Sequence, residues 1–196
     1  MCGRYYFSID LGNLSFVENI DGFSFEENFN IAPQSSVPVV IDNNLKECTW
    51  GYYPKWLKDQ SNSRPLFNTR FESLLEKKTF ISAFKKSRCL VPISGWYEWK
   101  LVDEEKQPYF FKNTNDENLL AAGLYWERSD GSTEFTIITT AAPVEINEVH
   151  DRSPLILDDV STGIWLSEDE PEDIHLNDFG NSIDFYQVSK SVNNPK

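Results

Sequence analysis

Cysteine and long apolar runs are both scarce in this sequence. Its 196 residues contain three cysteines, Cys2, Cys48 and Cys89, and no CxxC pair. An odd, scattered set is typical of free thiols in a reducing compartment and argues against a disulfide framework or a cysteine-based zinc site. No segment approaches the roughly 20 apolar residues that cross a bilayer, and the start, MCGRYYFSID, lacks the apolar core of a signal peptide. We therefore expect a cytoplasmic protein that contacts no membrane and needs neither metal nor cofactor.

Positive charge is also in short supply. Lys and Arg total 18 against 31 Asp and Glu, which gives a formal net charge of −13. Because non-specific affinity for DNA comes mainly from cations that neutralise phosphate, this balance argues against a general nucleic-acid coat. The charges are unevenly spread: residues 158–184 are acidic without Lys or Arg, whereas residues 52–100 contain ten cations. The middle of the chain is therefore the part expected to face a nucleic acid, with the acidic region solvated.

The apolar content supports one folded domain. Hydrophobic residues make up 40% of the chain, and no repeat or linker divides residues 1–196. Short helical patterns occur at 70–87, 143–149 and 159–166, and strand-like runs lie at 37–41, 47–53, 89–93, 108–112, 119–126, 134–140 and 183–189. Turn residues stand between them at 42–44, 113–116 and 129–131. The pattern predicts an α+β domain built on a curved, mostly antiparallel, barrel-like sheet with short peripheral helices.

The N-terminus carries a candidate reactive group. Cys2 follows Met1, and removal of Met1 would leave an α-amine and a thiol on one residue. The amine condenses with an aldehyde to a Schiff base, and the thiol then closes a five-membered thiazolidine ring. An α-amine pKa of about 7.7–8.0 leaves a useful neutral fraction near pH 7. The alternative is an ordinary second residue at a frayed terminus.

Several ordered motifs support the reactive interpretation. They are MCGRY at 1–5, NIAP at 30–33, WGYYPKW at 50–56, NTRFE at 68–72, RCLVPISGWYEWK at 88–100, TIITTAA at 136–142 and HDRSPLIL at 150–157. In this order the motifs resemble those of the SRAP (SOS-response-associated peptidase) family, which shields abasic sites in DNA. The chain departs from the family pattern at Thr69, at Ser153 and in its overall acidity.

The resemblance implies catalytic roles for Cys2, Asn68, Glu98 and His150. Glu98 lies among aromatic residues in GWYEW, where desolvation would raise its pKa toward the range that suits proton transfer; otherwise it would lie on the solvent face of a strand. His150 would protonate the sugar ring oxygen and help open the lesion to its aldehyde, although a lone His is more often structural. Asn68 would position the sugar remnant and the amine, although alone it would mark a turn.

The resemblance also implies a set of DNA contacts. Guanidinium groups clamp phosphate, and apolar or aromatic wedges stack on bases without reading sequence. The alternatives are surface arginines paired with Glu72 or Asp151, and a core aromatic at 56. The implied DNA-binding residues are Arg4, Pro33, Trp56, Arg70, Thr140 and Arg152.

Three functional hypotheses follow. The first is a covalent sensor, most simply a monomer, that removes Met1 itself, crosslinks Cys2 to an abasic site in single-stranded DNA, and joins the nucleoid when DNA is damaged. The second is a cysteine peptidase or amidohydrolase that uses Cys89 or Cys2 with His150; the apolar CLVPI run around Cys89 is a poor setting for a thiolate. The third is a non-catalytic module that binds single-stranded DNA.

Overall fold

A computed structural model describes residues 2–8, 14, 16–20, 23–54, 56–57, 63–167 and 182–194. Most of the regular structure in these residues is strand. The strands are β1 (Arg4–Phe7), β2 (Asn28–Ile31), β3 (Ser36–Ile41), β4 (Asn44–Trp50), β5 (Asn68–Arg70), β6 (Arg88–Ile93), β7 (Gly95–Val102), β8 (Glu105–Asn113), β9 (Leu119–Glu127), β10 (Thr133–Ala141), β11 (Arg152–Pro154), β12 (Ile156–Leu157) and β13 (Ile183–Gln187). The helical elements are η2 (Phe71–Glu76), α1 (Lys78–Lys86), α2 (Asp159–Leu166) and η4 (Lys190–Asn193).

Five of these strands form a closed barrel. They pair in the order β10-β4-β3-β6-β9, and β9 pairs again with β10 to complete the ring. The β3–β4, β3–β6, β6–β9 and β9–β10 pairs are antiparallel, while β10 runs parallel to β4 and to β5. Where β9 and β10 diverge, β11 pairs with β10, and β12 pairs with β9. The expected curved, mostly antiparallel, barrel-like sheet is confirmed.

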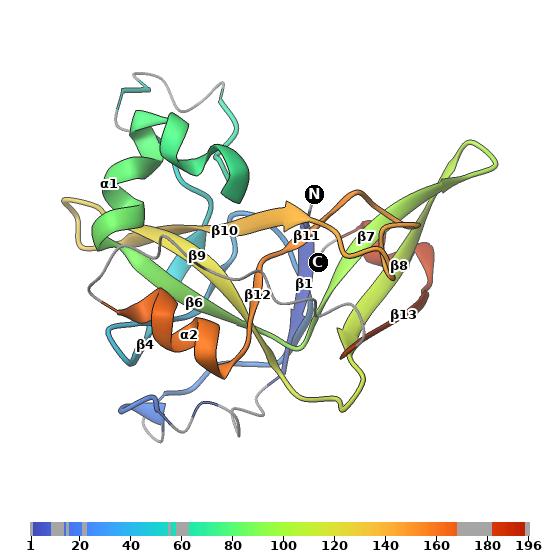
Figure 1. Ribbon diagram of the computed structural model, residues 1–196, viewed down its shortest axis with the longest axis horizontal. Helices are drawn as coiled ribbons and strands as arrows, with labels where there is room; N and C mark the ends of the chain where they lie inside the picture. The colour runs from blue at the N-terminus through green and yellow to red at the C-terminus, as the bar shows by residue number, and fades with distance from the viewer. Residues whose placement is uncertain are drawn as a thin grey trace.

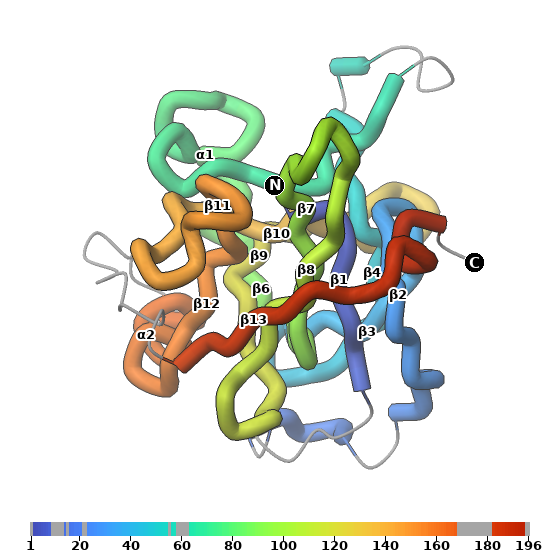
Figure 2. Tube along the Cα trace, turned by 90° about the vertical axis from the view of Figure 1, so that its right-hand side faces the viewer, coloured from blue at the N-terminus to red at the C-terminus, as the bar shows by residue number. Residues whose placement is uncertain are grey.

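A second sheet lies beside the barrel. Its five strands have the order β13-β8-β7-β1-β2, and every pair in it is antiparallel. Figure 1 shows the β7–β8 hairpin projecting from the body of the molecule, with β13 along its side. In both Figure 1 and Figure 2 the start of β1 lies close to β7, β10 and β11, where the two sheets meet.

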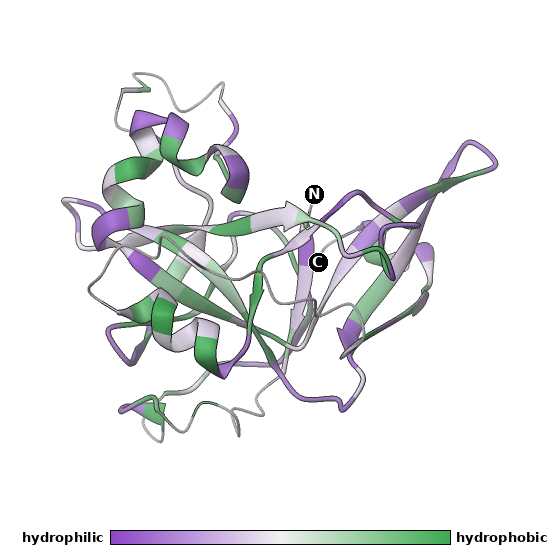
Figure 3. Cartoon of the chain, in the orientation of Figure 1, coloured by the Kyte–Doolittle hydropathy of each residue, from purple (hydrophilic) through white to green (hydrophobic). Residues whose placement is uncertain are grey.

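Continuous apolar runs arise because several barrel strands are buried on both faces. In β6, Val91 packs into the interior cluster, and its neighbour Leu90 packs into a second cluster under the helices. The same alternation holds for Val39 and Val40 of β3. Figure 3 shows the hydrophobic colouring concentrated on the barrel strands, with the tip of the β7–β8 hairpin hydrophilic. Neither face of such a strand can be polar, so the period-2 signal of a half-exposed strand disappears.

The helices cover one side of the barrel. Phe80, Ala83 and Phe84 of α1 and Trp165 of α2 are buried against the second cluster, and the Phe84 and Trp165 rings lie 5.8 Å apart. Asp158 caps α2 by accepting a hydrogen bond from the backbone N–H of Ser161 at 2.7 Å. Among the described residues, no helix is long and apolar enough to span a membrane.

Some local predictions were wrong. The expected helix at 143–149 is a series of turns, because Pro143 begins it and only Ile146 and Val149 of its apolar residues are buried. The helical pattern at 70–87 is divided into η2 and α1, with Lys77 in an extended conformation between them. The strands β1, β2, β5 and β7 had no strand-like run of their own in the prediction. Most of the acidic region 158–184, including His175, lies outside the described residues.

Candidate active site

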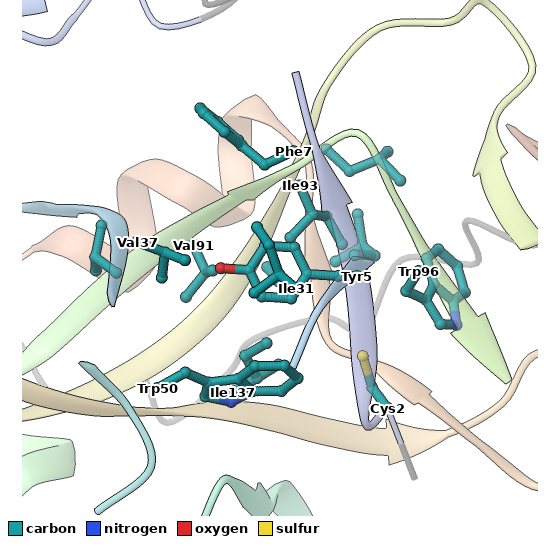
Figure 4. Close-up of a cluster of buried hydrophobic side chains, with 14 of the residues drawn as sticks. Cys2, Tyr5, Phe7, Ile31, Val37, Trp50, Val91, Ile93, Trp96 and Ile137 are labelled. Carbon is teal, nitrogen blue, oxygen red and sulfur yellow. The ribbon is translucent and has the colours of Figure 1, made fainter. Parts of the chain in front are cut away.

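Cys2 precedes β1 and is held in place. Its side chain is 0% exposed and belongs to the interior cluster, so the frayed-terminus alternative is wrong. The thiol donates a hydrogen bond to the backbone carbonyl of Arg4, with Sγ 3.7 Å from the oxygen. Figure 4 shows the sulfur directed toward Tyr5 and Trp96. Burial raises the pKa of the Cys2 thiol, and the charge of Glu98 raises it further, so the thiol is neutral near pH 7.

Asn68 connects a barrel-side strand to the N-terminus. Its side-chain amide donates to the backbone carbonyl of Cys2 at 2.7 Å. Its own carbonyl oxygen Oδ1 is buried and has no hydrogen-bond partner in the described part of the chain. Parallel pairing of β5 with β10 places Asn68 opposite Ile137. The next residue, Thr69, is buried and shares a hydrogen bond with Thr136 at 3.0 Å. The threonine that departs from the family pattern therefore has its hydroxyl satisfied inside the fold.

Glu98 and His150 come together from separate parts of the chain. Glu98 lies in β7, beside β1, and is 2% exposed, so the alternative of a solvent-facing strand residue is wrong. Its Oε2 lies 3.9 Å from Nε2 of His150. The other imidazole nitrogen, Nδ1, accepts a hydrogen bond from the backbone N–H of Arg152 at 3.0 Å. Nδ1 also lies 3.0 Å from Oδ1 of Asp151. A neutral ring that accepts the Arg152 bond carries its proton on Nε2, the nitrogen nearer Glu98.

Burial shifts both groups toward their neutral forms. It raises the pKa of Glu98 from 4.5 to about 7, so that the protonated and ionised forms coexist near neutrality. It lowers the pKa of His150 below the ordinary 6.5. A carboxyl that is half protonated beside a neutral imidazole is suited to moving protons in either direction at pH 7.

Arg4 is fixed at the wall of a cavity. Its guanidinium donates to Asn30 Oδ1 at 3.1 Å, to the carbonyl of Val192 at 2.7 Å and to that of Asn193 at 3.4 Å. The cavity has a volume of about 690 Å³ and is lined by Gly3, Arg4, Glu98, Trp99, Lys106, His150 and Asn193. Of these residues, Trp99 belongs to one of the sequence motifs. No motif contains Lys106 or Asn193, and only the tertiary structure places them at this cavity.

The other two arginines differ in their surroundings. Arg70 is exposed at the end of β5. Arg152 forms a bidentate ion pair with Glu72, at 2.7 and 2.9 Å, and also donates to the carbonyl of Thr139 at 2.7 Å. Glu72 is one of the two carboxylates that the sequence offers as alternatives to a phosphate contact. Thr140, 9% exposed, pairs with Ser153 across β10 and β11.

The two expected base contacts lie on loops. Pro33 is half-buried between β2 and β3. Trp56 is 70% exposed, so the alternative of a core aromatic is wrong. Among the described residues there is no cluster of three or more His, Cys, Asp or Glu that could hold a metal ion.

Cys89 does not provide a second reactive thiol. It is 0% exposed inside the barrel, opposite Gly123 of β9, where a Cβ would lie 2.8 Å from its sulfur. Burial raises its pKa well above the ordinary value. A thiol in this setting is a poor nucleophile, which disfavours a hydrolase based on Cys89.

Fold and site together define a class: a β-barrel protein whose cysteine near the N-terminus lies beside a buried carboxyl and an imidazole. The chain belongs to the SOS response associated peptidase (SRAP) family, whose model matches residues 1–195. It is 31% identical to the abasic site processing protein YoqW of Bacillus subtilis, over 100% of this chain and 96% of that protein. It is 28% identical to the abasic site processing protein YedK of Escherichia coli, over 86% of this chain and 80% of that protein.

Solved structures share the fold. A protein from Bacteroides thetaiotaomicron superposes with a TM-score of 0.81 at 20% identity, covering 97% of this chain and 93% of that one. A phage-related protein from Bordetella bronchiseptica gives a TM-score of 0.73 at 24% identity, covering 96% and 95%. At these identities the likeness concerns the arrangement of the strands.

Proposed function

We propose that this protein traps abasic sites in single-stranded DNA by forming a covalent thiazolidine through Cys2, after hydrolysis of the Met1–Cys2 peptide bond. The observation that carries the proposal is a chain of contacts around Cys2: Asn68 donates to its backbone carbonyl, and the charge of Glu98 acts on its thiol. Glu98 in turn lies 3.9 Å from His150, and both line a cavity together with Gly3, the residue after Cys2. The family's description as a peptidase supports cleavage after Met1, and the names of the relatives support abasic DNA as the substrate.

The chemistry balances with these groups. Cleavage consumes one water and releases an α-amine on Cys2. The amine adds to the sugar aldehyde, and loss of water gives an imine. The thiol then adds to the imine carbon, and its proton goes to the imine nitrogen. No oxidant or reductant is needed.

Each neighbouring group has a defined task in this scheme. The protonated form of His150, which is the minor one at pH 7, donates a proton to the sugar ring oxygen when the lesion opens. Glu98 carries protons to and from the amine and the departing water. Asn68 holds the Cys2 carbonyl and so fixes the amine. Because the sulfur is directed into the core cluster, ring closure requires the Cβ–Sγ bond to turn toward the cavity.

The order of attack follows from the surroundings of the thiol. Burial keeps the Cys2 thiol protonated, so the neutral amine is the first nucleophile and the thiol acts on the imine. Arg4 and Arg70 supply phosphate contacts under this proposal, and Arg152 does so only by exchanging its partner Glu72 for phosphate.

A denaturing gel tests the proposal. The protein is incubated with an oligonucleotide that carries one abasic site, and intact mass first establishes that Met1 is absent. The wild type and Cys48→Ala, which removes a buried thiol elsewhere in the barrel, should both give a shifted band. Cys2→Ala should lose this band but give one after borohydride reduction, because its α-amine still forms an imine.

Two outcomes would contradict the proposal. A stable shifted band from Cys2→Ala without reduction would exclude thiazolidine formation. No band from wild type of the correct mass, despite measurable DNA binding, would favour the non-catalytic module instead.

A further inference from the structure

A second cavity adjoins the proposed site. It has a volume of about 520 Å³ and lies between β2 and the segment that contains η4. Its lining includes Asn28, Phe29, Tyr97, Ser191 and Asn194. Figure 2 shows the C-terminal segment crossing beside β2. None of the roles considered so far uses this cavity.

An aromatic platform stands at the cavity. Phe29 is 60% exposed, although it is a large apolar side chain on a strand. Its ring stacks on that of Tyr6 with a centroid distance of 4.7 Å and an interplanar angle of 10°. The Tyr6 hydroxyl donates to Glu27 at 2.5 Å, and the Tyr97 hydroxyl donates to the carbonyl of Phe29 at 2.7 Å. The platform is thus held from both sides, and a held, exposed ring is a stacking surface.

The polar groups around the platform suit an uncharged ring with polar edges. Asn28 and Asn194 carry amides, and Ser191 carries a hydroxyl, all of which donate and accept hydrogen bonds. Among the residues that the structure describes, the lining contains no Lys or Arg, and Glu27 contributes a carboxylate that repels anions. A phosphate is therefore disfavoured here, whereas a nucleobase fits both the stacking surface and the edge groups.

A direct connection links this cavity to Arg4. Asn30 lines the cavity, accepts a hydrogen bond from Arg4 through Oδ1, and donates to the carbonyl of Val192 at 3.1 Å. Asn193 lines the proposed site, and its neighbours Val192 and Asn194 line the second cavity. A strand whose phosphate lies on Arg4 would therefore have its adjoining nucleotide beside Phe29.

We propose that the cavity beside Phe29 binds the nucleobase adjacent to the abasic residue on the same strand. The inference rests on the proposed function for the position of the lesion, and it adds a subsite that takes an intact base by stacking. Because every base has a π-face, this subsite would hold the strand with little sequence preference.

Fluorescence titration tests the subsite without the covalent step. In a Cys2→Ala background, oligonucleotides carry a tetrahydrofuran abasic analogue with 2-aminopurine on its 5′ or its 3′ side. We expect binding to quench one of the two probes, because stacking on Phe29 quenches this base. Adding Phe29→Ala should remove the quenching and weaken binding about tenfold. Phe29→Trp should keep both, and Val160→Ala, which shortens a 71% exposed side chain on α2, should change neither.

The possible failures are distinguishable. Quenching and affinity that are the same in Phe29→Ala as in its parent would overturn the subsite, even if wild type forms the crosslink. Phe29-dependent quenching together with no crosslink from wild type would overturn the covalent function and leave the subsite in place. A lack of DNA binding by the parent protein would overturn both.

Discussion

At the residue scale, Glu98 and His150 influence stability in opposite directions. Burial raises the pKa of Glu98 to about 7, so the folded state binds its proton more tightly than the unfolded state does. The contribution of Glu98 to the free energy of unfolding is fully present below pH 4.5 and is lost as pH rises through about 7. Burial lowers the pKa of His150, so the stability from that group is lost as pH falls through 6.5 toward the lower value. The pair is most compatible with the fold when both members are neutral.

Replacing Glu98 should change the pH dependence of unfolding. The difference in unfolding free energy between wild type and Glu98→Gln should fall by about 3 kcal/mol as pH rises from 4 to 8, because the glutamine cannot ionise. Urea titrations across this range measure the difference. For the matched variant His150→Gln, the difference in unfolding free energy between wild type and variant should instead increase as pH rises. If the difference in unfolding free energy between wild type and Glu98→Gln does not change with pH, the Glu98 carboxyl is solvated in the folded state.

At the element scale, the β7–β8 hairpin depends on a tight turn with unfavourable residues. Asp103 and Glu104 have φ values of +48° and +64°, so both occupy the left-handed region that two-residue type I′ turns require. Neither is Asn or Gly, the residues that adopt this conformation at least cost. The hairpin contributes Trp99 and Lys106 to the cavity wall, so its register matters to the site.

Glu104→Gly should stabilise the protein. Removing the Cβ relieves the left-handed conformation, and we expect the unfolding free energy to increase by about 0.5–1 kcal/mol. Urea unfolding measures the change. The same substitution one residue later, Glu105→Gly, falls in strand β8 and should decrease stability instead. A decrease for both variants would contradict the assigned turn.

The second element of interest is η4, which positions Arg4. The carbonyls of Val192 and Asn193 accept from the Arg4 guanidinium, and the Asn193 side chain accepts from Trp99 Nε1 at 2.7 Å. Asn193→Ala and Trp99→Phe each remove the same bond between β7 and η4. We expect either change to weaken binding of abasic DNA a few-fold, and the double variant to be no worse than either single one.

The Arg4→Ala background provides the control for this element. If η4 acts through Arg4, adding Asn193→Ala to Arg4→Ala should not weaken binding further. Fluorescence anisotropy with labelled abasic oligonucleotides measures the DNA affinity of the wild type, of Arg4→Ala, of Asn193→Ala and of the variant that combines the two substitutions. Additive losses would show that Asn193 contacts DNA independently of Arg4.

At the scale of the whole molecule, the net charge of −13 limits the electrostatic contribution to DNA binding. Among the described residues, two of the three arginines expected at phosphate have no carboxylate partner: Arg4, which is held by neutral acceptors, and the exposed Arg70. Two phosphate contacts on a single strand give a slope of about −1.4 for log affinity against log salt concentration.

Arg70→Ala should reduce the magnitude of that slope by about 0.7, because one phosphate contact is lost. Anisotropy titrations at several salt concentrations measure it. Lys46→Ala, which removes an exposed cation on β4, should leave the slope unchanged. An unchanged slope for Arg70→Ala would exclude Arg70 from the interface.

The sequence was sufficient where strands are long and apolar. Residues 89–93 and 119–126 were predicted as strands and form β6 and β9, because burial on both faces leaves an unbroken apolar run. The short, polar β5 and the aromatic β7 were not predicted, because pairing with β10 and with β1, both distant in the sequence, stabilises them. Likewise, the ordered motifs indicated the family, but they did not decide between phosphate and a carboxylate as the partner of Arg152, which the structure pairs with Glu72.

The sequence by itself therefore determined the barrel-forming strands, the family and the candidate reactive residues, since those depend on residue type and local order. Only the tertiary structure decided that Cys2 is buried, that Asn68 holds its carbonyl, and that Glu98 titrates near neutrality. It also decided that η4 and Asn30, the residue after Phe29, contact Arg4. The physical reason is that burial, and with it pKa and reactivity, depends on neighbours that chain order does not specify.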